Sequence, residues 1–238
     1  MATYYVSSGS GNDSDNGESP ATAKKTLASV LGLGMADGDT VEILDESIYY
    51  EDNISIDIPN LTITHTASHL GRPVVDAGGN IRFWEHGTSG TIFHHIEMRN
   101  CTYGIYKGTG NAGEFHLTGC FIHDLESLYN NNIAGNASNK TSINECILQF
   151  KDVGGYSTNQ HIRIADNVTF RNCLITSSAD IPLITDYGDS GNTVTASYST
   201  FISRGENGDS IIRVGKAINC IVSGSGHGIA SDDHTYNL

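Results

Sequence analysis

The chain of 238 residues is long enough to bury a substantial core and to form one elongated unit. Its 13 Lys and Arg residues oppose 27 Asp and Glu residues, which gives a formal net charge of -14. This charge argues against nucleic-acid binding, because phosphate backbones are bound by clustered Lys and Arg. It also disfavours acidic polysaccharides unless a local basic groove offsets the field. No run of about 18 apolar residues is present, so the sequence predicts no membrane-spanning helix.

Residues 1–40 have the composition of an N-terminal cap. ATYYVS predicts a short strand, and the segment SGSGNDSDNGESPAT that follows is rich in turn-forming residues. In KKTLASVLGLGM, Leu27, Val30 and Leu31 recur at helical spacing, with Thr22 or Thr26 as the candidate N-cap. A helix here would cover the open end of a solenoid, whose terminal edge otherwise promotes aggregation.

Residues 41–238 are predicted to form one all-β domain of short strands separated by Gly, Asn, Asp and Ser clusters. Five stretches repeat the same order of a strand, a small polar residue, a cysteine and two apolar residues: MRNCTY, LTGCFI, INECIL, FRNCLI and AINCIV. A sixth, YSTFIS, has Thr200 at the position of the cysteine. A repeat of roughly 20 to 30 residues is typical of a solenoid. We therefore expect a single right-handed parallel β-helix.

The odd number of cysteines and their place in the repeat predict a ladder of buried free thiols. Stacked inward positions do not usually give the geometry of a disulfide. The spacing contains no CxxC or His/Cys pattern, and adjacent His94 and His95 must point to opposite faces of a strand. No metal site is expected from these residues.

The opening YYVSSGSGNDSDNGESPATAKKTLASVL, followed by DGDTVEIL, resembles the N-terminal cap of the pectate-lyase-like superfamily of right-handed parallel β-helix proteins. The stretches that contain Asn-Cys resemble the coil repeats of that superfamily. The resemblance implies the fold for essentially the whole chain. It leaves the function open, because the superfamily includes polysaccharide lyases, glycoside hydrolases, epimerases and non-catalytic phage proteins.

For a lyase, the resemblance implies a basic residue that removes a proton from a uronate, with Ca²⁺ bound by acidic residues of adjacent coils. The candidate bases are Lys151, Arg163 and Arg171, which lie in two successive coils. Arg163 alternates with Ile162 and Ile164, so its side chain is expected to point outward. No carboxylate cluster repeats beside them, which favours the interpretation that they are solvated charges on the outer face of a sheet.

Glycoside hydrolases of the superfamily carry NxD, DD, GHG and RxK motifs in that order. This chain contains Gly226-His227-Gly228 and then Asp232-Asp233, in reversed order and with no RxK after them. Hydrolysis needs two carboxylates at a defined separation across a groove. We therefore interpret the GHG as a flexible corner.

Five aromatic residues lie in predicted strands or corner loops rather than at obvious core positions: Trp84, Tyr103, Tyr106, Tyr129 and Tyr156. Rings of this kind form flat platforms for sugars. They also mark interfaces between subunits. The sequence leaves both interpretations open.

Two functions of different classes follow. The favoured one is a non-catalytic structural or adhesive phage virion protein, such as a capsid decoration or tail-associated β-helix. It would be a homotrimer that contacts other virion proteins or a surface glycan. The first residues lack the basic and apolar regions of a secretory signal, and no active site is legible. The alternative is a secreted polysaccharide lyase or related carbohydrate-active β-helix enzyme, with Ca²⁺ if it is a lyase.

Overall fold

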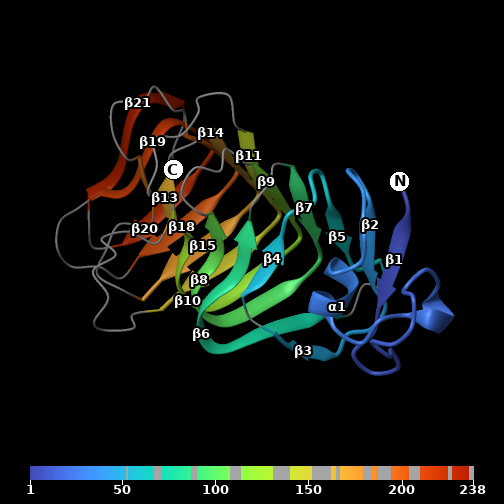
Figure 1. Cartoon of the computed structure of the whole chain (residues 1–238). Helices are drawn as coiled ribbons and strands as arrows, with labels where there is room; N and C mark the ends of the chain where they lie inside the picture. Colours follow the sequence, from blue (N-terminus) through green and yellow to red (C-terminus); the bar gives the residue numbers. More distant parts are fainter. Residues whose placement is uncertain are drawn as a thin grey trace.

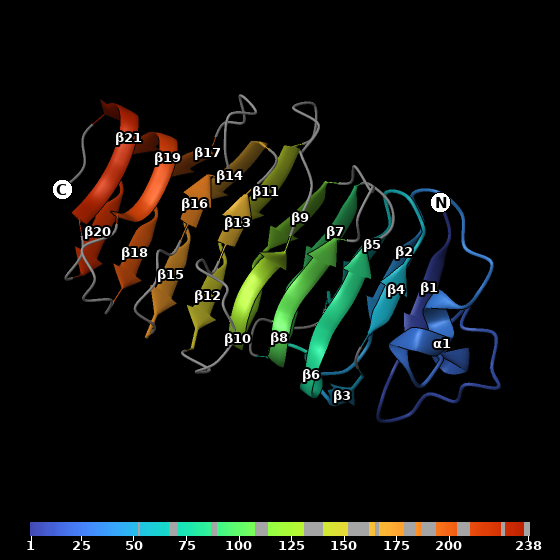
Figure 2. The ribbon, with the colours of Figure 1, turned by 60° about the vertical axis from the view of Figure 1, so that its left-hand side comes forward.

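The computed structural model is a right-handed parallel β-helix with very little helix (Figure 1). Figure 2 shows the strands stacked along the axis, with the N-terminal segment at one end and the C-terminus at the other. The prediction of an all-β solenoid is confirmed. The structure describes residues 1–51, 53–66, 71–86, 90–107, 114–130, 140–151, 162–164, 167–178, 184–186, 194–203, 210–224 and 227–235.

The strands form three parallel sheets, A, B and C, which the chain visits in that order in each coil. Sheet A contains β1 (Thr3–Val6), β2 (Thr40–Ile43), β5 (Thr62–Thr64), β7 (Thr91–His94), β9 (Phe115–Thr118), β11 (Lys140–Asn144), β14 (Asn167–Arg171) and β17 (Val194–Ser197). Sheet B contains β3 (Ile48–Tyr50), β12 (Ile147–Phe150), β15 (Leu174–Ser177), β18 (Thr200–Ser203) and β20 (Ile221–Gly224). Sheet C contains β4 (Ile54–Ile56), β13 (Ile162–Ile164) and β16 (Ile184–Asp186).

Five long strands bend from one sheet into the next. The strands β6 (Val74–His86), β8 (Glu97–Lys107) and β10 (Phe121–Asn130) run from sheet B into sheet C. The strands β19 (Ser210–Ile218) and β21 (His227–Thr235) run from sheet C into sheet A. The bend within β6, β8 and β10 is where the candidate site lies.

Side chains alternate between the core and the outer surface along each strand, as the period of a β-strand requires. In sheet A the buried positions pair from coil to coil and form one continuous column. Its members are Val41, Ile63, Phe93, Leu117, Ile143, Phe170, Ala196 and Ala217. This stacking places the core along the axis of the solenoid.

The corner between sheets A and B explains the cysteine repeat. At six of these corners a residue with positive φ precedes the buried corner side chain, and Asn and Gly tolerate this left-handed conformation. In three coils this residue is Gly119 (φ 64°), Asn172 (φ 52°) or Asn219 (φ 50°), followed directly by a buried cysteine. The small polar residue of the repeat is therefore a corner residue, and the residue after it points into the core.

Two assignments within the repeat are wrong. Thr200 pairs with Leu174 on the outer face of sheet B, so it does not occupy the position of the cysteine. Ser199 occupies that position, and its hydroxyl accepts a hydrogen bond from the backbone of Cys173 at 3.2 Å. Cys101 lies at a different bend, from sheet B to sheet C, where it pairs with Leu125. Asn100 (φ 58°) precedes it and produces the same local sequence at another corner.

The five thiols are free and buried, as the sequence predicts. Burial raises the pKa of the Cys101 thiol to about 12, so almost no thiolate is present at neutral pH. We expect a thiol reagent to modify none of the five in the native protein and all of them in denaturant. Counting modified thiols by mass spectrometry in both conditions checks this. Rapid native labelling would contradict the buried ladder.

The N-terminal segment covers the first coil with one short helix, α1 (Leu27–Leu31), after the 3-10 turn η1 (Pro20–Thr22). Thr26 is the N-cap, and its hydroxyl accepts a hydrogen bond from the Ser29 backbone at 3.2 Å. Glu51 accepts hydrogen bonds from the backbone of Leu27 and Ala28 at 2.7 and 2.8 Å, which binds the helix to the first coil. Strand β1 pairs with β2, so the strand expected in the cap is the first strand of sheet A. No helix among the described residues has the length and apolar character needed to cross a membrane.

Candidate functional site

The three basic residues considered for a lyase lie on three different sheets. Lys151 directly follows β12 of sheet B, Arg163 lies in β13 of sheet C, and Arg171 ends β14 of sheet A. The side chain of Arg163 lies outside the described part of the chain. Because the three sheets face different directions, the structure does not bring these positions onto one face.

Four of the five aromatic residues lie on sheet C. Trp84 and Tyr129 both pair with Ile105, whose side chain is buried, while Tyr106 pairs with Glu85 of β6. The side chains of Trp84, Tyr106 and Tyr129, and the whole of Tyr156, lie outside the described residues. Tyr103 is half-buried. The sugar-platform and interface interpretations of these rings both stay predictions.

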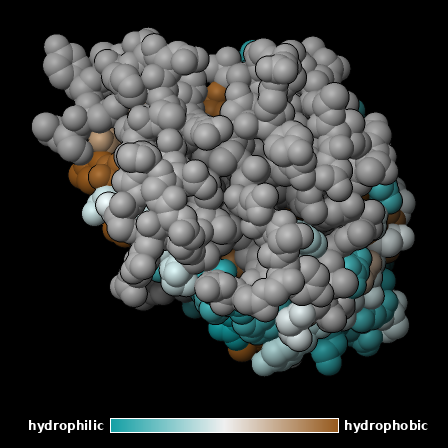
Figure 3. Space-filling view, turned by 90° about the vertical axis from the view of Figure 1, so that its left-hand side faces the viewer, coloured by the Kyte–Doolittle hydropathy of each residue, from teal (hydrophilic) through white to brown (hydrophobic). Residues whose placement is uncertain are grey.

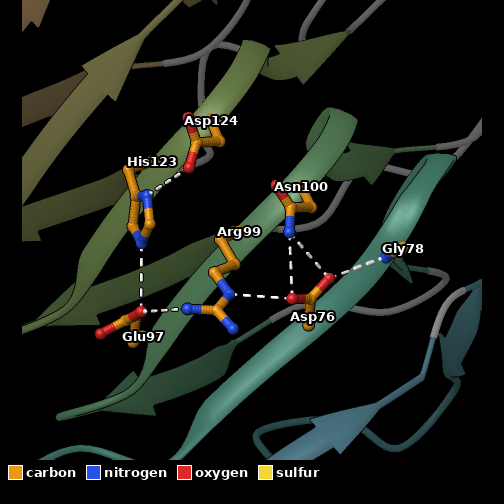
Figure 4. A network of polar contacts seen from close by, with 7 residues as sticks. All are labelled: Asp76, Gly78, Glu97, Arg99, Asn100, His123 and Asp124. Atoms are coloured by element: carbon orange, nitrogen blue, oxygen red, sulfur yellow. Dashed lines mark hydrogen bonds and ion pairs between the residues drawn. The ribbon is translucent and has the colours of Figure 1, made fainter.

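A polar cluster missed by the sequence analysis lies on the outer face of sheet B, where β6, β8 and β10 bend toward sheet C (Figure 4). Asp76 pairs with Arg99, and Arg99 pairs with His123, so three neighbouring strands bring these side chains into one row. The row faces outward, because the preceding residue of each strand belongs to the core: Val75, Met98 and Ile122.

Asp76 is the fixed centre of one half of the cluster. It is 6 % exposed, and its carboxylate accepts hydrogen bonds from the Gly78 backbone at 2.9 Å, Arg99 Nε at 2.8 Å and Asn100 Nδ2 at 3.0 Å. The bond to Gly78 is an Asx turn, which opens the bend through Gly78 (φ 64°) and Gly79 (φ 86°). Burial alone would raise the pKa of Asp76, but these donors hold it below its usual range. Asp76 is therefore an ionised group that fixes Arg99.

The other half of the cluster is an imidazole between two carboxylates. His123 Nδ1 lies 2.8 Å from Asp124 Oδ2, and His123 Nε2 lies 3.1 Å from Glu97 Oε1. Arg99 Nη1 lies 3.6 Å from the same Glu97 oxygen and so connects this half to Asp76. The Asp124 side chain is 49 % exposed, while those of His123 and Glu97 are 17 % and 20 % exposed. Asp124 is thus the member of the group most open to a ligand.

An apolar surface adjoins the cluster on the same face. The ring of Phe121 stacks on that of His123, with centroids 4.3 Å apart and an interplanar angle of 20°. Ile147 and Leu174 continue the row of Phe121 in the following coils and are half-buried. Gln149, which is exposed, continues the row of His123. The face therefore changes from charged to apolar and neutral polar along the axis.

The Glu97–His123–Asp124 group can hold a proton in more than one place. A neutral imidazole has one ring N–H and donates to one carboxylate only, whereas an imidazolium donates to both. A proton taken up at Asp124 can thus pass through the ring to Glu97 with little movement of heavy atoms. Groups of this kind serve as general acids or bases, provided that a substrate reaches the exposed carboxylate. Within the described residues, no three or more His, Cys, Asp or Glu side chains are grouped to hold a metal ion.

Part of this cluster can be predicted from the alternation of buried and outward-facing residues along the strands. In IEMRN the buried Met98 lies between Glu97 and Arg99, and in FIHD the buried Ile122 precedes His123. The sequence thus predicts outward polar side chains in two coils. It does not give the register that places Arg99 beside both Asp76 and His123, because that depends on the length of each intervening loop.

No protein-family model matches the chain, and no curated protein matches it. Solved structures of two enzymes resemble it in fold. Pectate lyase Pel9A has a TM-score of 0.65 at 15 % identity, with coverage of 94 % of this chain and 62 % of that one. The GH136 lacto-N-biosidase from Eubacterium ramulus has a TM-score of 0.56 at 15 % identity, with coverage of 94 % and 45 %. This chain spans less than two thirds of either protein, and identities this low show a shared parallel β-helix fold alone.

Proposed function

We propose that this chain is a carbohydrate-active β-helix protein that cleaves glycosidic linkages by acid–base chemistry at Glu97, His123 and Asp124. The observation that carries the proposal is the imidazole held between two carboxylates on an outer face, next to an apolar surface. The fold adds support, because a pectate lyase and a lacto-N-biosidase have it too.

The roles follow from exposure and contacts. Asp124 is the most exposed carboxylate and would exchange a proton with the substrate or with an attacking water. His123 carries that proton to or from Glu97. Arg99, held by the ionised Asp76, positions Glu97 from the other side. In hydrolysis, Asp124 would give its proton to the leaving oxygen and, as a carboxylate, would then take one from the attacking water, so that the group returns to its starting protonation.

The test is cleavage of a panel of glycans by the native chain and by the variants Glu97→Gln, His123→Gln and Asp124→Asn. We expect each variant to lose roughly 10² to 10⁴-fold in rate, the typical contribution of one general acid or base. His116→Gln is the matched control, because His116 is also half-buried on an outer face but lies on sheet A and bonds Ser142. New reducing ends report any cleavage, and absorbance of an unsaturated product identifies elimination.

Two results would overturn the proposal: no cleavage by the native chain on any glycan of the panel, or full activity in all three cluster variants. Folding must be checked alongside. Asp124 is half exposed, so Asp124→Asn should unfold close to the native chain. The side chains of Glu97 and His123 are mostly buried, so Glu97→Gln and His123→Gln should destabilise the chain by about 1 to 3 kcal/mol and must be assayed under conditions where they remain folded.

A second candidate is the non-catalytic virion protein, as a homotrimer that contacts a glycan or other virion proteins. Its support is exposed apolar surface in the C-terminal coils, where Tyr198, Ile202 and Ile221 are 59 %, 38 % and 53 % exposed. Figure 3 looks at that end and shows a few hydrophobic residues at the surface near the edge of the view. Light scattering tests it: a stable trimer with no cleavage of any glycan favours this function, and an active monomer excludes it.

A further inference from the structure

We propose that the glycan bound at this site is neutral, without carboxylate or sulfate groups along its chain. This inference rests on the proposed function and adds the class of substrate. It comes from the charges and surfaces that surround Glu97, His123 and Asp124.

The cluster has no cation left for an anionic sugar. Three carboxylates, those of Asp76, Glu97 and Asp124, face one guanidinium and one imidazole. Arg99 already contacts Asp76 at 2.8 Å and Glu97 at 3.6 Å. A ligand carboxylate would have to displace Glu97 and would then meet the exposed Asp124. Close like charges repel, so a uronate would bind with a penalty here.

The two outer rows of sheet B that run through Phe121 and His123 hold no other permanent cation among the described residues. Two cations lie at their margins: Arg72, whose Nε donates to the Gly119 carbonyl at 2.9 Å, and Lys151, which follows β12. Among the described positions of those rows Arg99 is the only Lys or Arg, since the row of His123 continues as Gln149, Thr176, Ile202 and Ser223. The parallel row continues from Phe121 as Ile147, Leu174, Thr200 and Ile221. The formal net charge of -14 adds repulsion at long range.

The same rows have what a neutral sugar requires. The rings of Phe121 and His123 stack face to face and present their edges outward, and with the half-buried Ile147 they give an apolar surface with a polar border for a pyranose. Gln149 and Thr176 lie beside it with neutral donors and acceptors for hydroxyl groups. Sugar sites in general combine apolar walls with a few placed polar groups.

The experiment follows the imidazole C–H signals of His123 by NMR, with their assignment from His123→Gln. Neutral hexasaccharides of galactan, mannan and xylan are titrated against a hexasaccharide of polygalacturonate, each at low and high salt. We expect a neutral hexasaccharide to shift the His123 signals with little dependence on salt. The uronate should bind about tenfold or more weakly, a difference typical of one unfavourable charge contact.

Gln149→Lys sharpens the test, because it places a cation in the same row without altering the cluster. Because Gln149 is proposed to bind hydroxyl groups, Gln149→Met, which removes the amide without adding a charge, is the reference for this variant. Relative to Gln149→Met, we expect Gln149→Lys to bind the uronate about tenfold more tightly at low salt and the neutral glycan equally well. Thr169→Lys, at an exposed position of sheet A, is the matched control and should change neither affinity.

The outcomes separate the two proposals. If the uronate shifts the His123 signals at least as strongly as the neutral glycans, the substrate class is wrong while the site stands. If no hexasaccharide shifts them and the chain cleaves no glycan, the proposed function fails as well.

Discussion

Asp76→Asn is expected to destabilise the folded chain by roughly 2 to 3 kcal/mol, which is large for a substitution that preserves shape. The carboxylate of Asp76 is nearly buried and accepts from a backbone N–H, a guanidinium and an amide. An asparagine side chain has one acceptor oxygen and adds two donors that face donors already present. Since the Arg99 side chain is 28 % exposed, water replaces part of the lost contact, which keeps the cost below that of a fully buried pair.

The pH dependence of this difference identifies its cause. The pKa of Asp76 is lowered in the folded chain, so its contribution is fully present above the unfolded value near 3.8. It is lost as the pH falls through the lower folded pKa. Urea unfolding at neutral pH and below pH 3.8 should therefore show the native chain and Asp76→Asn converging in acid.

Asp57→Asn is the matched control for Asp76→Asn. Asp57 is exposed, follows β4 and accepts a hydrogen bond from the Ser55 hydroxyl at 3.1 Å. Surface substitutions of this kind usually change stability by less than about 0.5 kcal/mol. An equal loss in both variants, or a difference that persists in acid, would show that Asp76 does not hold the bend through its charge.

The sequence predicts the solenoid because each coil repeats the same local pattern. A corner residue that tolerates positive φ, a buried cysteine and alternating apolar residues recur at Cys120 and Cys173, so the fold can be predicted without any long-range information. The same local pattern also occurs at a corner of another kind, and there the predicted position in the coil is wrong. Asn100-Cys101 has the right residues, yet its bend joins sheets B and C.

The candidate site depends on register between coils, which local patterns do not contain. Lys151 and Arg171 lie in neighbouring coils in the sequence, but the corners between them place one after sheet B and the other on sheet A. Conversely, 23 residues separate Asp76 from Arg99 in the sequence, and their side chains meet at 2.8 Å because one full coil returns the chain to the same sheet. Which reactive side chains of a solenoid lie together can therefore be predicted only when the length of each coil is known.

Phe170→Ala is expected to cost about 3 to 5 kcal/mol, the usual range for deleting a buried aromatic side chain. Phe170 is fully buried in the axial column of sheet A, between Ile143 and Ala196 of the neighbouring coils. Its ring meets that of Phe201 edge-on, with centroids 6.4 Å apart at 79°. Ala196 is too small to fill the space that a truncated Phe170 would leave. A cavity should therefore remain, and the loss of folding free energy should include the full contribution of that cavity.

Phe170→Leu keeps most of the volume and should cost less than about 1.5 kcal/mol, while Thr169→Ala, one residue earlier on the exposed face, should cost little. Urea unfolding gives these values, and amide exchange locates them. In a solenoid each coil is stabilised by its neighbours, so the cavity should loosen the adjacent coils most. Faster exchange in β11, β14 and β17 with β2 and β5 protected would show that stability passes from coil to coil. Uniform loss over all strands would show instead that the described coils unfold as one unit.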